Sequence, residues 1–406
     1  MISFYWRRIF LGKIILFVFL LVVGFYLMLL RLTELPLMRG TFRDANRFER
    51  PRFRLQQNGN YWIVHDYIVA RSSELHGNQS VTLTSHGRYD DLKDLEWLML
   101  RWRAPISLAV FVDEDDFEPT LYSFNHIKYC TIYGQSFTKW VSVQLILENQ
   151  HLTDEVRRME PHRARGFKCL SQSEMDAKFM PSIDNNGRCK YPMNLLKNVA
   201  RQNARTYFIF ALELNLLPTR NFAKIFLEFA HAAQLPNPLR SVFCVPIFPY
   251  NSNSQHPIHP PKFKSDLVGY VEAYLNDSET LPALEYNRLK GLESWLHSTF
   301  MADEMGVYQV EKSPENCAVY VSANLYEPFY DQRVLESPYT TDSTRLQVLS
   351  GLEFDFVLMD GAFLLHRLNF NKSSRVRSNH EYMSPDQVHI REMIMLSDLT
   401  LWPNFV

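Results

Sequence analysis

The sequence carries little net charge and lacks the short motifs that mark common hydrolases and zinc sites. Lys and Arg number 43 against 44 Asp and Glu, and the pI is near 6.9. Bulk charge therefore gives no reason to expect a nucleic-acid partner. No C-x-x-C pair or Cys/His cluster indicates zinc, and the absence of G-x-S-x-G and H-E-x-x-H argues against a secreted hydrolase. The chain also has no internal repeat of fixed period and no low-complexity run.

Cysteine is scarce, with five residues in a chain of 406. In an oxidising compartment at most two disulfides can form, which leaves one thiol over. Cys169 and Cys189 flank a loop-like stretch and are the predicted pair. Cys244 lies in the apolar run VFCVPIF and is predicted to be a buried free thiol.

One uncharged apolar run, IILFVFLLVVGFYLMLL, occupies residues 14–30. Its length is close to the roughly 20 residues that span a bilayer core. Arg7, Arg8 and Lys13 precede it, which favours a cytoplasmic N-terminus. Because no small-residue cleavage site follows, the pattern favours a retained transmembrane signal-anchor over the cleaved signal peptide of a secreted protein. Both interpretations place the rest of the chain in the secretory lumen.

The remaining chain divides into short flanking segments and one large luminal domain. Residues 1–13 form the expected cytoplasmic tail. Residues 31–60 are rich in Arg, Asn, Gln and Pro, lack periodicity and are predicted to be a stem. Residues 61–406 can bury a core, since 46% of the chain is hydrophobic. Three N-x-S/T sequons are compatible with luminal exposure, and they begin at Asn78, Asn276 and Asn371.

Apolar strands and amphipathic helices alternate along this luminal part. That order predicts an α/β fold with a mixed, mostly parallel sheet flanked by helices. Ligands of such sheets bind at the carboxyl ends of strands. The predicted strands are 80–85, 106–112, 141–147, 206–214, 242–248 and 354–360, and the predicted helices are 91–101, 192–202 and 221–233.

Polar residues at strand ends are the candidate site. Glu213 and Asn215 end the strand YFIFALELN, and alternation places both side chains on one face. Oxygen ligands there could hold Mn²⁺ or Mg²⁺, although one uncharged ligand would make the site hold the metal more weakly. An ordinary strand-end polar pair is the alternative.

Three further groups are weighed against simpler explanations. The acidic run 113–116 (DEDD) follows a strand, but four adjacent acids more often form a solvated loop. His366 follows the apolar run GAFLL and is either a packed histidine or a metal ligand. His256 and His259 have ligand-like spacing within HPIHPP, whose prolines make it a stiff loop.

Several segments together resemble glycosyltransferase family 49, which includes a β-1,4-glucuronyltransferase and xylosyl- and glucuronyltransferases that act on α-dystroglycan. The segments appear in the family's order and are 81–112, 191–219, 243–248, 326–333 and 354–367. The resemblance implies a GT-A-like fold, a UDP-sugar donor, Mn²⁺ and inversion at the sugar carbon.

The resemblance also implies site residues. By position the family's metal-binding D-x-D falls on Glu213 and Asn215, and its late histidine falls on His366. Asn194, Lys197 and Asn198 fall on the family's nucleotide-proximal helix, with Lys197 where an arginine is usual. Asp331 and Asp360 are the candidates for the catalytic base, although Asp360 could instead be a turn residue before Gly361.

The expected function is a Golgi type II membrane glycosyltransferase that transfers a sugar, by resemblance glucuronic acid, to a glycan or glycoprotein acceptor. The family's glycine motif is absent after residues 331–333, and Pro249 replaces the family's acidic residue after Phe248. These departures keep open a second interpretation, a catalytically degenerate Golgi glycan-binding or scaffold protein.

Overall fold

The computed structural model describes residues 54–72, 76–113, 116–148, 167–179, 191–233, 238–251, 259–275, 289–298, 304–332 and 338–368. They belong to one compact unit, Phe53–Val406. The predicted signal-anchor, residues 14–30, lies outside these ranges. Among the described residues no helix combines the length and apolar character needed to cross a bilayer.

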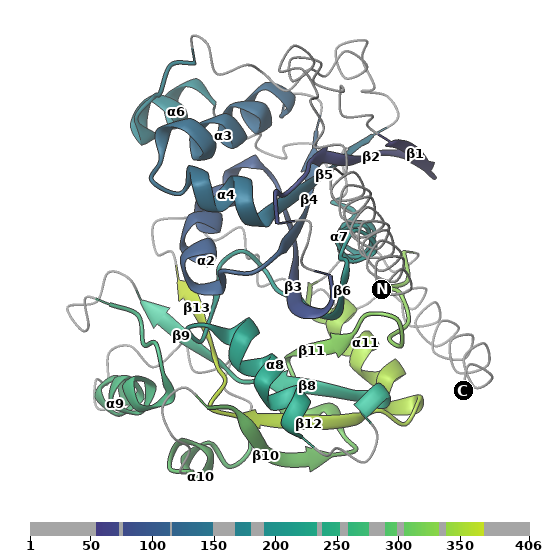
Figure 1. Ribbon diagram of the computed structural model, residues 1–406, viewed down its shortest axis with the longest axis vertical. Helices are drawn as coiled ribbons and strands as arrows, with labels where there is room; N and C mark the ends of the chain where they lie inside the picture. The colour runs from purple at the N-terminus through teal and green to yellow at the C-terminus, as the bar shows by residue number, and fades with distance from the viewer. Residues whose placement is uncertain are drawn as a thin grey trace, which may run out of the picture. The chain divides into compact units, whose positions relative to one another are not determined.

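Within these ranges ten strands form one mixed sheet (Figure 1). The four strands β5, β4, β3 and β6 are mutually parallel, as are β8 and β12, whereas antiparallel pairs join the others. The prediction of a mixed α/β sheet flanked by helices is confirmed. The strands in spatial order are β1 (Arg54–Asn58), β2 (Tyr61–Ile68), β5 (Val141–Glu148), β4 (Ile106–Val112), β3 (Gly77–Gly87), β6 (Thr206–Ala211), β11 (Val319–Ala323), β8 (Ser241–Val245), β12 (Asp355–Asp360) and β10 (Gly306–Glu311).

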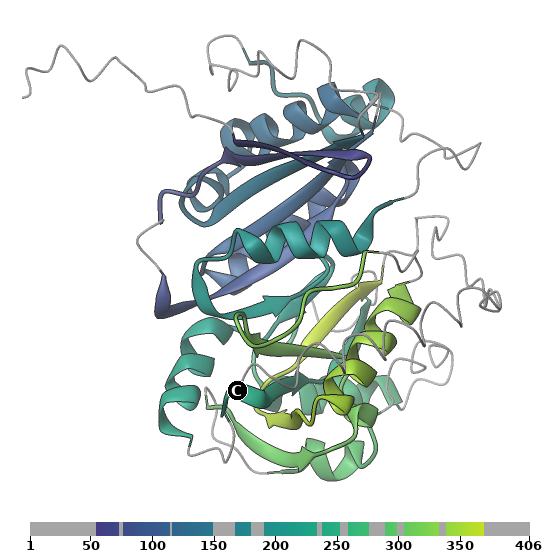
Figure 2. The ribbon, with the colours of Figure 1, turned by 90° about the vertical axis from the view of Figure 1, so that its right-hand side faces the viewer.

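Helices cover both faces of the parallel strands. Along β4, Leu108 and Val110 point into a core shared with α2, α3 and α4, whereas Ala109 and Phe111 pack against α7. Figure 2 looks onto α7, which lies across this second face. The helices are α2 (Leu95–Trp102), α3 (Phe117–Cys130), α4 (Gly134–Trp140), α6 (Gln172–Lys178), α7 (Met193–Gln202), α8 (Phe222–Ala232), α9 (Lys264–Leu275), α10 (Leu292–Leu296) and α11 (Pro338–Gly351), with 3-10 turns η1 (Tyr89–Asp94), η3 (Pro238–Arg240) and η5 (Pro314–Asn316).

Two predicted strands end earlier than their apolar runs suggest. The run 206–214 leaves the sheet after β6, because the chain turns and the Leu216 N–H donates to the Glu213 carbonyl. The run 242–248 breaks at Pro246, which has no N–H to donate. The part after the break is β9 (Ile247–Asn251), which belongs to a second sheet.

The second sheet has the order β7 (Leu216–Pro218), β13 (Leu364–Leu368) and β9. β13 pairs antiparallel with β7 and parallel with β9. In this register His366 lies opposite Leu216. The sheet therefore brings together two segments that are far apart in the sequence, and both carry predicted site residues. At the other end of the described chain, β1 occupies residues assigned to the stem and pairs with β2.

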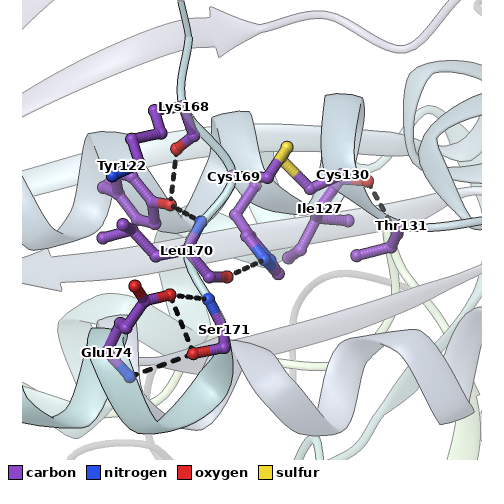
Figure 3. Close-up of a disulfide and its surroundings, with 10 residues drawn as sticks. Tyr122, Ile127, Cys130, Thr131, Lys168, Cys169, Leu170, Ser171 and Glu174 are labelled. Carbon is purple, nitrogen blue, oxygen red and sulfur yellow. Dashed lines mark hydrogen bonds between the residues drawn. A yellow bond between two sulfur atoms is a disulfide. The ribbon is translucent and has the colours of Figure 1, made fainter.

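The predicted Cys169–Cys189 disulfide is wrong, because Cys169 bonds to Cys130 instead. Figure 3 shows Cys130 at the end of α3, beside the extended segment that carries Cys169. Tyr122 of α3 holds this segment: its hydroxyl accepts from Leu170 N at 2.8 Å and donates to Lys168 O at 2.9 Å. These contacts place the two cysteine Cα atoms 5.7 Å apart, within the usual range for a disulfide.

The predicted free thiol at Cys244 is also wrong. Cys244 is buried in β8 and bonds to Cys317, just before β11. The pairing of β8 with β11 brings the two residues close, since Cys244 lies opposite Tyr320. An apolar sequence context predicts burial of a cysteine correctly, but it gives no information on a partner that lies 73 residues away.

Candidate functional site

The carboxyl ends of β3, β4 and β6 meet at one edge of the sheet, where ligands of parallel sheets bind. The turn after β6 lies directly over the end of β3. A Cβ at Gly87 would be 3.2 Å from Leu214 Cδ1 and 3.1 Å from Asp91 Cβ. Glycine at this position therefore allows the turn that carries Glu213 and Asn215 to approach the strand closely.

Asn215 and His366 meet at this turn, although 151 residues separate them. Asn215 Nδ2 donates to His366 Nε2 over 3.0 Å, and Arg367 N donates to Asn215 O over 3.0 Å. Burial lowers the pKa of His366, partly offset by the Asp94 carboxylate, so the ring is neutral near pH 7 and Nε2 can accept. Glu213, in the same turn, has an exposed side chain.

These residues do not fit a divalent-metal site as they stand. The nitrogen of His366 that faces Asn215 already accepts an amide hydrogen. The amide replaces a charged oxygen ligand, which Mn²⁺ and Mg²⁺ prefer. Across the described part of the chain, no three His, Cys, Asp or Glu side chains gather closely enough to hold a metal ion.

One face of α7 binds the backbone of residues 324–331. Asn194 Nδ2 donates to Asp331 O at 2.7 Å. Asn198 makes two bonds with Tyr330, donating to its carbonyl at 2.7 Å and accepting from its N–H at 2.8 Å. The two predicted donor-site asparagines thus hold the segment that ends at Asp331. Asn194 Oδ1 is buried and has no hydrogen-bond partner in the described chain.

Arg201 extends the same face of α7 and was not found from the sequence. Its guanidinium donates to Asn324 Oδ1 at 2.9 Å and to Pro328 O at 2.6 Å, and it also bonds the carbonyls of Asn324 and Glu327. The spacing of residues 194, 198 and 201 is the helical spacing of one face. That spacing was the signal available in the sequence.

A buried carboxylate anchors the other side of this segment. Glu327 accepts from Tyr320 Oη at 2.7 Å, from Arg345 Nη2 at 2.7 Å and Nε at 2.9 Å, and from the Ser322 hydroxyl. Burial opposes ionisation, but Arg345 and Arg201 outweigh it and lower the pKa of Glu327 to about 2. The segment that carries Asp331 is therefore rigidly supported.

Lys197 lies between the end of β3 and this segment. Burial, and secondarily the Lys197 charge, lower the pKa of His86 to about 3, so His86 is neutral. His86 Nδ1 and Tyr191 Oη are 2.7 Å apart, and Lys197 Nζ lies 5.0 Å from the centre of the Tyr330 ring. Lys197 thus contributes positive charge at the edge of the sheet where β3 ends. Its neighbour His86, and Tyr191 beside His86, were not singled out from the sequence.

The acidic run after β4 faces an arginine. Arg88 Nη1 lies 3.6 Å from Asp113 Oδ2 and 3.8 Å from Asp116 Oδ2. The guanidinium also lies over the rings of Phe111 and Tyr191. Asp116 is buried. Asp113 and Asp116 therefore form ion pairs with Arg88. The two acids between them, residues 114 and 115, lie outside the described residues.

Asp360 is buried at the end of β12, and its hydrogen bonds within the described chain involve neither α7 nor Asn215. Its Oδ1 accepts from Lys264 Nζ at 2.6 Å, and its Oδ2 accepts from the Ser298 hydroxyl at 2.5 Å. Both oxygens are engaged in contacts that hold α9 and residue 298 to the end of β12. This arrangement supports the turn-residue interpretation of Asp360. Of the paired histidines, His256 lies outside the described residues, and His259 is exposed.

The family described as glycosyl-transferase for dystroglycan matches residues 80–395. The chain belongs to glycosyltransferase family 49. The match covers every predicted site residue, from Asn194 to His366. The family resemblance of the sequence is thereby confirmed.

Curated relatives are distant. Xylosyl- and glucuronyltransferase LARGE1 of Homo sapiens is 21% identical over 337 residues, which cover 82% of this chain and 37% of the relative. Beta-1,4-glucuronyltransferase 1 of Danio rerio is 24% identical over 153 residues, 35% of this chain and 33% of the relative. The chain spans about a third of the length of these relatives.

Among solved structures, S. aureus TarS 1-349 in complex with UDP is similar at a TM-score of 0.33 and 8% identity, over 80% of this chain and 65% of that one. A likeness of this size says nothing about the ligands of this chain.

Proposed function

We propose that this protein is a Golgi type II membrane glycosyltransferase of GT-A type that transfers a sugar from a UDP-sugar to a glycan or glycoprotein acceptor. Residues 14–30 anchor it, and the described unit lies in the lumen. Family membership supports the reaction class. The two disulfides support an oxidising compartment. Glucuronic acid and xylose, which the names of the relatives contain, are the first donors to test.

One observation carries the proposal: α7 supplies both a cation and the support for a carboxylate at the same strand edge. Lys197 contributes its charge beside His86, while Asn194 on the same helix holds the backbone of Asp331. A transferase needs positive charge at the leaving diphosphate and a base at the attacking hydroxyl. One helix carries Lys197 and also binds the backbone of Asp331, which supports assigning the two residues to one site.

The reaction is an inverting displacement. Asp331 removes the proton from the acceptor hydroxyl, whose oxygen forms a bond to the anomeric carbon of the sugar. The bond between that carbon and the diphosphate oxygen breaks, and UDP leaves with the added negative charge. Lys197 stabilises that charge, whereas Asp360 serves the fold. Mn²⁺ is implied by the resemblance, but the residues present do not fit it, and no step is assigned to a metal.

The second candidate is a catalytically degenerate family member that binds glycans or acts as a Golgi scaffold. The observation that favours it is the hydrogen bond between Asn215 and His366, which occupies the position of the family's metal ligands. The first candidate function includes transfer of the sugar, whereas the second includes binding without transfer.

The test is release of UDP by the full chain, purified in detergent from eukaryotic cells, with a panel of UDP-sugars and glycan acceptors. Asp331→Asn is expected to lower transfer at least about 100-fold, the usual contribution of a general base, while UDP binding persists. Glu293→Gln, at an exposed site on α10, is the matched control. UDP binding without transfer would support the second candidate, and a folded protein that binds no UDP would refute both nucleotide binding and transfer.

A further inference from the structure

We infer that the acceptor glycan packs on an exposed apolar surface made by Leu325, Tyr326 and Phe329, on the segment that ends at Asp331. The inference rests on the proposed function, since it concerns the acceptor whose hydroxyl Asp331 activates. It goes beyond that function by assigning the residues that bind the acceptor chain and the part of the chain that they recognise, the apolar faces of successive sugar rings. These three residues are called the 325–329 surface below.

The first argument concerns exposure. Leu325 is 77% exposed, Tyr326 39% and Phe329 50%. No other stretch of five residues in the described part of the chain exposes three large apolar side chains. Their neighbours Glu327 and Tyr330 are buried. The segment therefore divides its side chains between an inner set, which holds the fold, and an outer set, which faces solvent.

The second argument concerns the backbone that presents these side chains. Buried Arg201 donates to three carbonyls within residues 324–328, and buried Arg345 donates to the carbonyl of Phe329 at 3.0 Å. The Arg201 guanidinium also lies over the Phe329 ring, 4.7 Å from its centre. A backbone fixed in this way loses little conformational entropy when a ligand binds. The 325–329 surface is thus preorganised.

The third argument concerns size and charge. The exposed area of the 325–329 surface is roughly 250–400 Å², taking about 150–250 Å² for each side chain in full. A stable protein interface buries about 800 Å² on each partner. Residues 324–332 contain no Lys or Arg, so nothing in this segment attracts an anionic membrane. A sugar ring has an apolar face of C–H bonds, which packs on the partly negative face of an aromatic ring. A short oligosaccharide is therefore the partner that fits.

The fourth argument concerns the distance to the proposed base. Phe329 precedes Asp331 by two residues, so their Cα atoms are at most about 7 Å apart. Tyr326 lies at most about 18 Å from Asp331 by the same measure. Asn194 holds this end of the segment by donating to Asp331 O at 2.7 Å. A chain whose terminal hydroxyl lies at Asp331 would place its following sugars over Phe329 and then Tyr326.

The experiment measures binding of hexasaccharides to the full chain in detergent by calorimetry, with and without UDP. The panel contains hexasaccharides of glucose, galactose, xylose, mannose and N-acetylglucosamine, each with and without a terminal glucuronic acid. At least one is expected to bind. Tyr326→Ala and Phe329→Ala are each expected to weaken that binding at least about ten-fold, since each removes an aromatic ring that the ligand covers. In transfer, KM for the hexasaccharide should rise while kcat changes less than about two-fold, because neither ring touches the reacting atoms.

The controls are matched in exposure and in residue type. Tyr129→Ala removes a tyrosine that is 40% exposed on α3, and Val310→Ala removes an apolar side chain that is 49% exposed on β10. Both are expected to bind the hexasaccharide as wild type. Phe329→Trp keeps an aromatic ring beside Arg201 and is expected to retain binding, which separates the loss of the ring from a disturbed segment.

Three results overturn the inference. They are a folded protein that binds UDP but no hexasaccharide, alanine variants that bind the hexasaccharide within about two-fold of wild type, and variants that lose self-association instead of glycan binding, which would assign the 325–329 surface to a second copy of the chain. UDP binding persists in each case, so the proposed function survives. Hexasaccharide binding that depends on Phe329 in a folded protein without affinity for UDP would do the reverse, sustaining the surface and refuting the transferase.

Discussion

Replacing Glu327 with glutamine is expected to destabilise the protein by about 3 kcal/mol near pH 7. The glutamine keeps the shape of the side chain but removes the charge that Arg345 and Arg201 share. Both arginines are nearly inaccessible to solvent, at 5% and 2% exposed. They would be left as buried cations without a carboxylate, which is among the costliest defects in a folded protein.

Two independent arguments give this magnitude. Lowering the pKa of Glu327 from 4.5 to about 2 on folding corresponds to about 3 kcal/mol of stabilisation of the ionised form. Removing one partner of a buried ion pair costs about 3–5 kcal/mol in other proteins. Because the folded pKa is the lower one, this stabilisation is complete above pH 4.5 and is lost as the pH falls toward about 2.

The assay is urea denaturation of wild type and Glu327→Gln at pH 7 and at intervals down to pH 3. The difference between the two proteins should shrink below pH 4.5, because the wild-type carboxyl then takes up a proton on unfolding. Glu315→Gln is the control. Glu315 pairs with Lys290 at the surface, where both side chains are more than half exposed, and its replacement should leave the midpoint unchanged.

The reasoning would be refuted by a Glu327→Gln protein that loses less than about 1 kcal/mol at pH 7. It would be refuted equally if the difference stayed constant between pH 6 and pH 3.

Three further changes have expected outcomes. Asn198→Ala removes two hydrogen bonds to the Tyr330 backbone and should cost about 2 kcal/mol or more, together with reduced transfer. Gly361→Ala should prevent folding or destabilise strongly, because its φ is +72° and a Cβ would lie 2.1 Å from Glu304 O. Cys130→Ser opens a 39-residue loop and should cost about 4 kcal/mol by chain entropy. Denaturation midpoints measure all three.

Matched controls separate these effects from general damage. Gly59 has φ +56° but open space around it, so Gly59→Ala should cost far less than Gly361→Ala. Asn203→Ala, one turn beyond the α7 face that binds residues 324–331, should leave transfer unchanged. Peptide mapping without reductant should recover Cys169 linked to Cys130. Recovery of a Cys169–Cys189 peptide would contradict the observed pairing.

Much of the fold follows from local patterns in the sequence. The run ISLAVFV predicts a buried strand and forms β4 over the same residues, because a continuous apolar run fits a strand covered on both faces. Leu92, Leu95, Leu98 and Met99 are all buried as their helical spacing predicts, although the first turn is 3-10. The five matching segments and their order along the chain were enough to identify the family.

The sequence predicted which residues lie together at the turn after β6, whereas the roles of the candidate site residues stay predictions. The meeting of Asn215 with His366 agrees with the carried-over positions, and the pairing of β7 with β13 produces it. The sequence did not predict that Asn194 and Asn198 bind backbone, since a polar side chain on a helix can face a ligand or a neighbouring segment equally well. The contacts that decide this lie more than 130 residues away.

The sequence by itself determined the most apolar strands, the apolar helix faces and the family, because hydrophobic periodicity is a local property of the chain. These strands are β3, β4, β5, β6, β8 and β12. The tertiary structure alone decided which cysteines pair, where the apolar runs leave the sheet, and that Asp360 is buried against Lys264. Each of these depends on residues that become neighbours only after the sheet has formed. Loss of charge at Asn215 is visible in the sequence, but its hydrogen bond to His366 exists only in the folded protein.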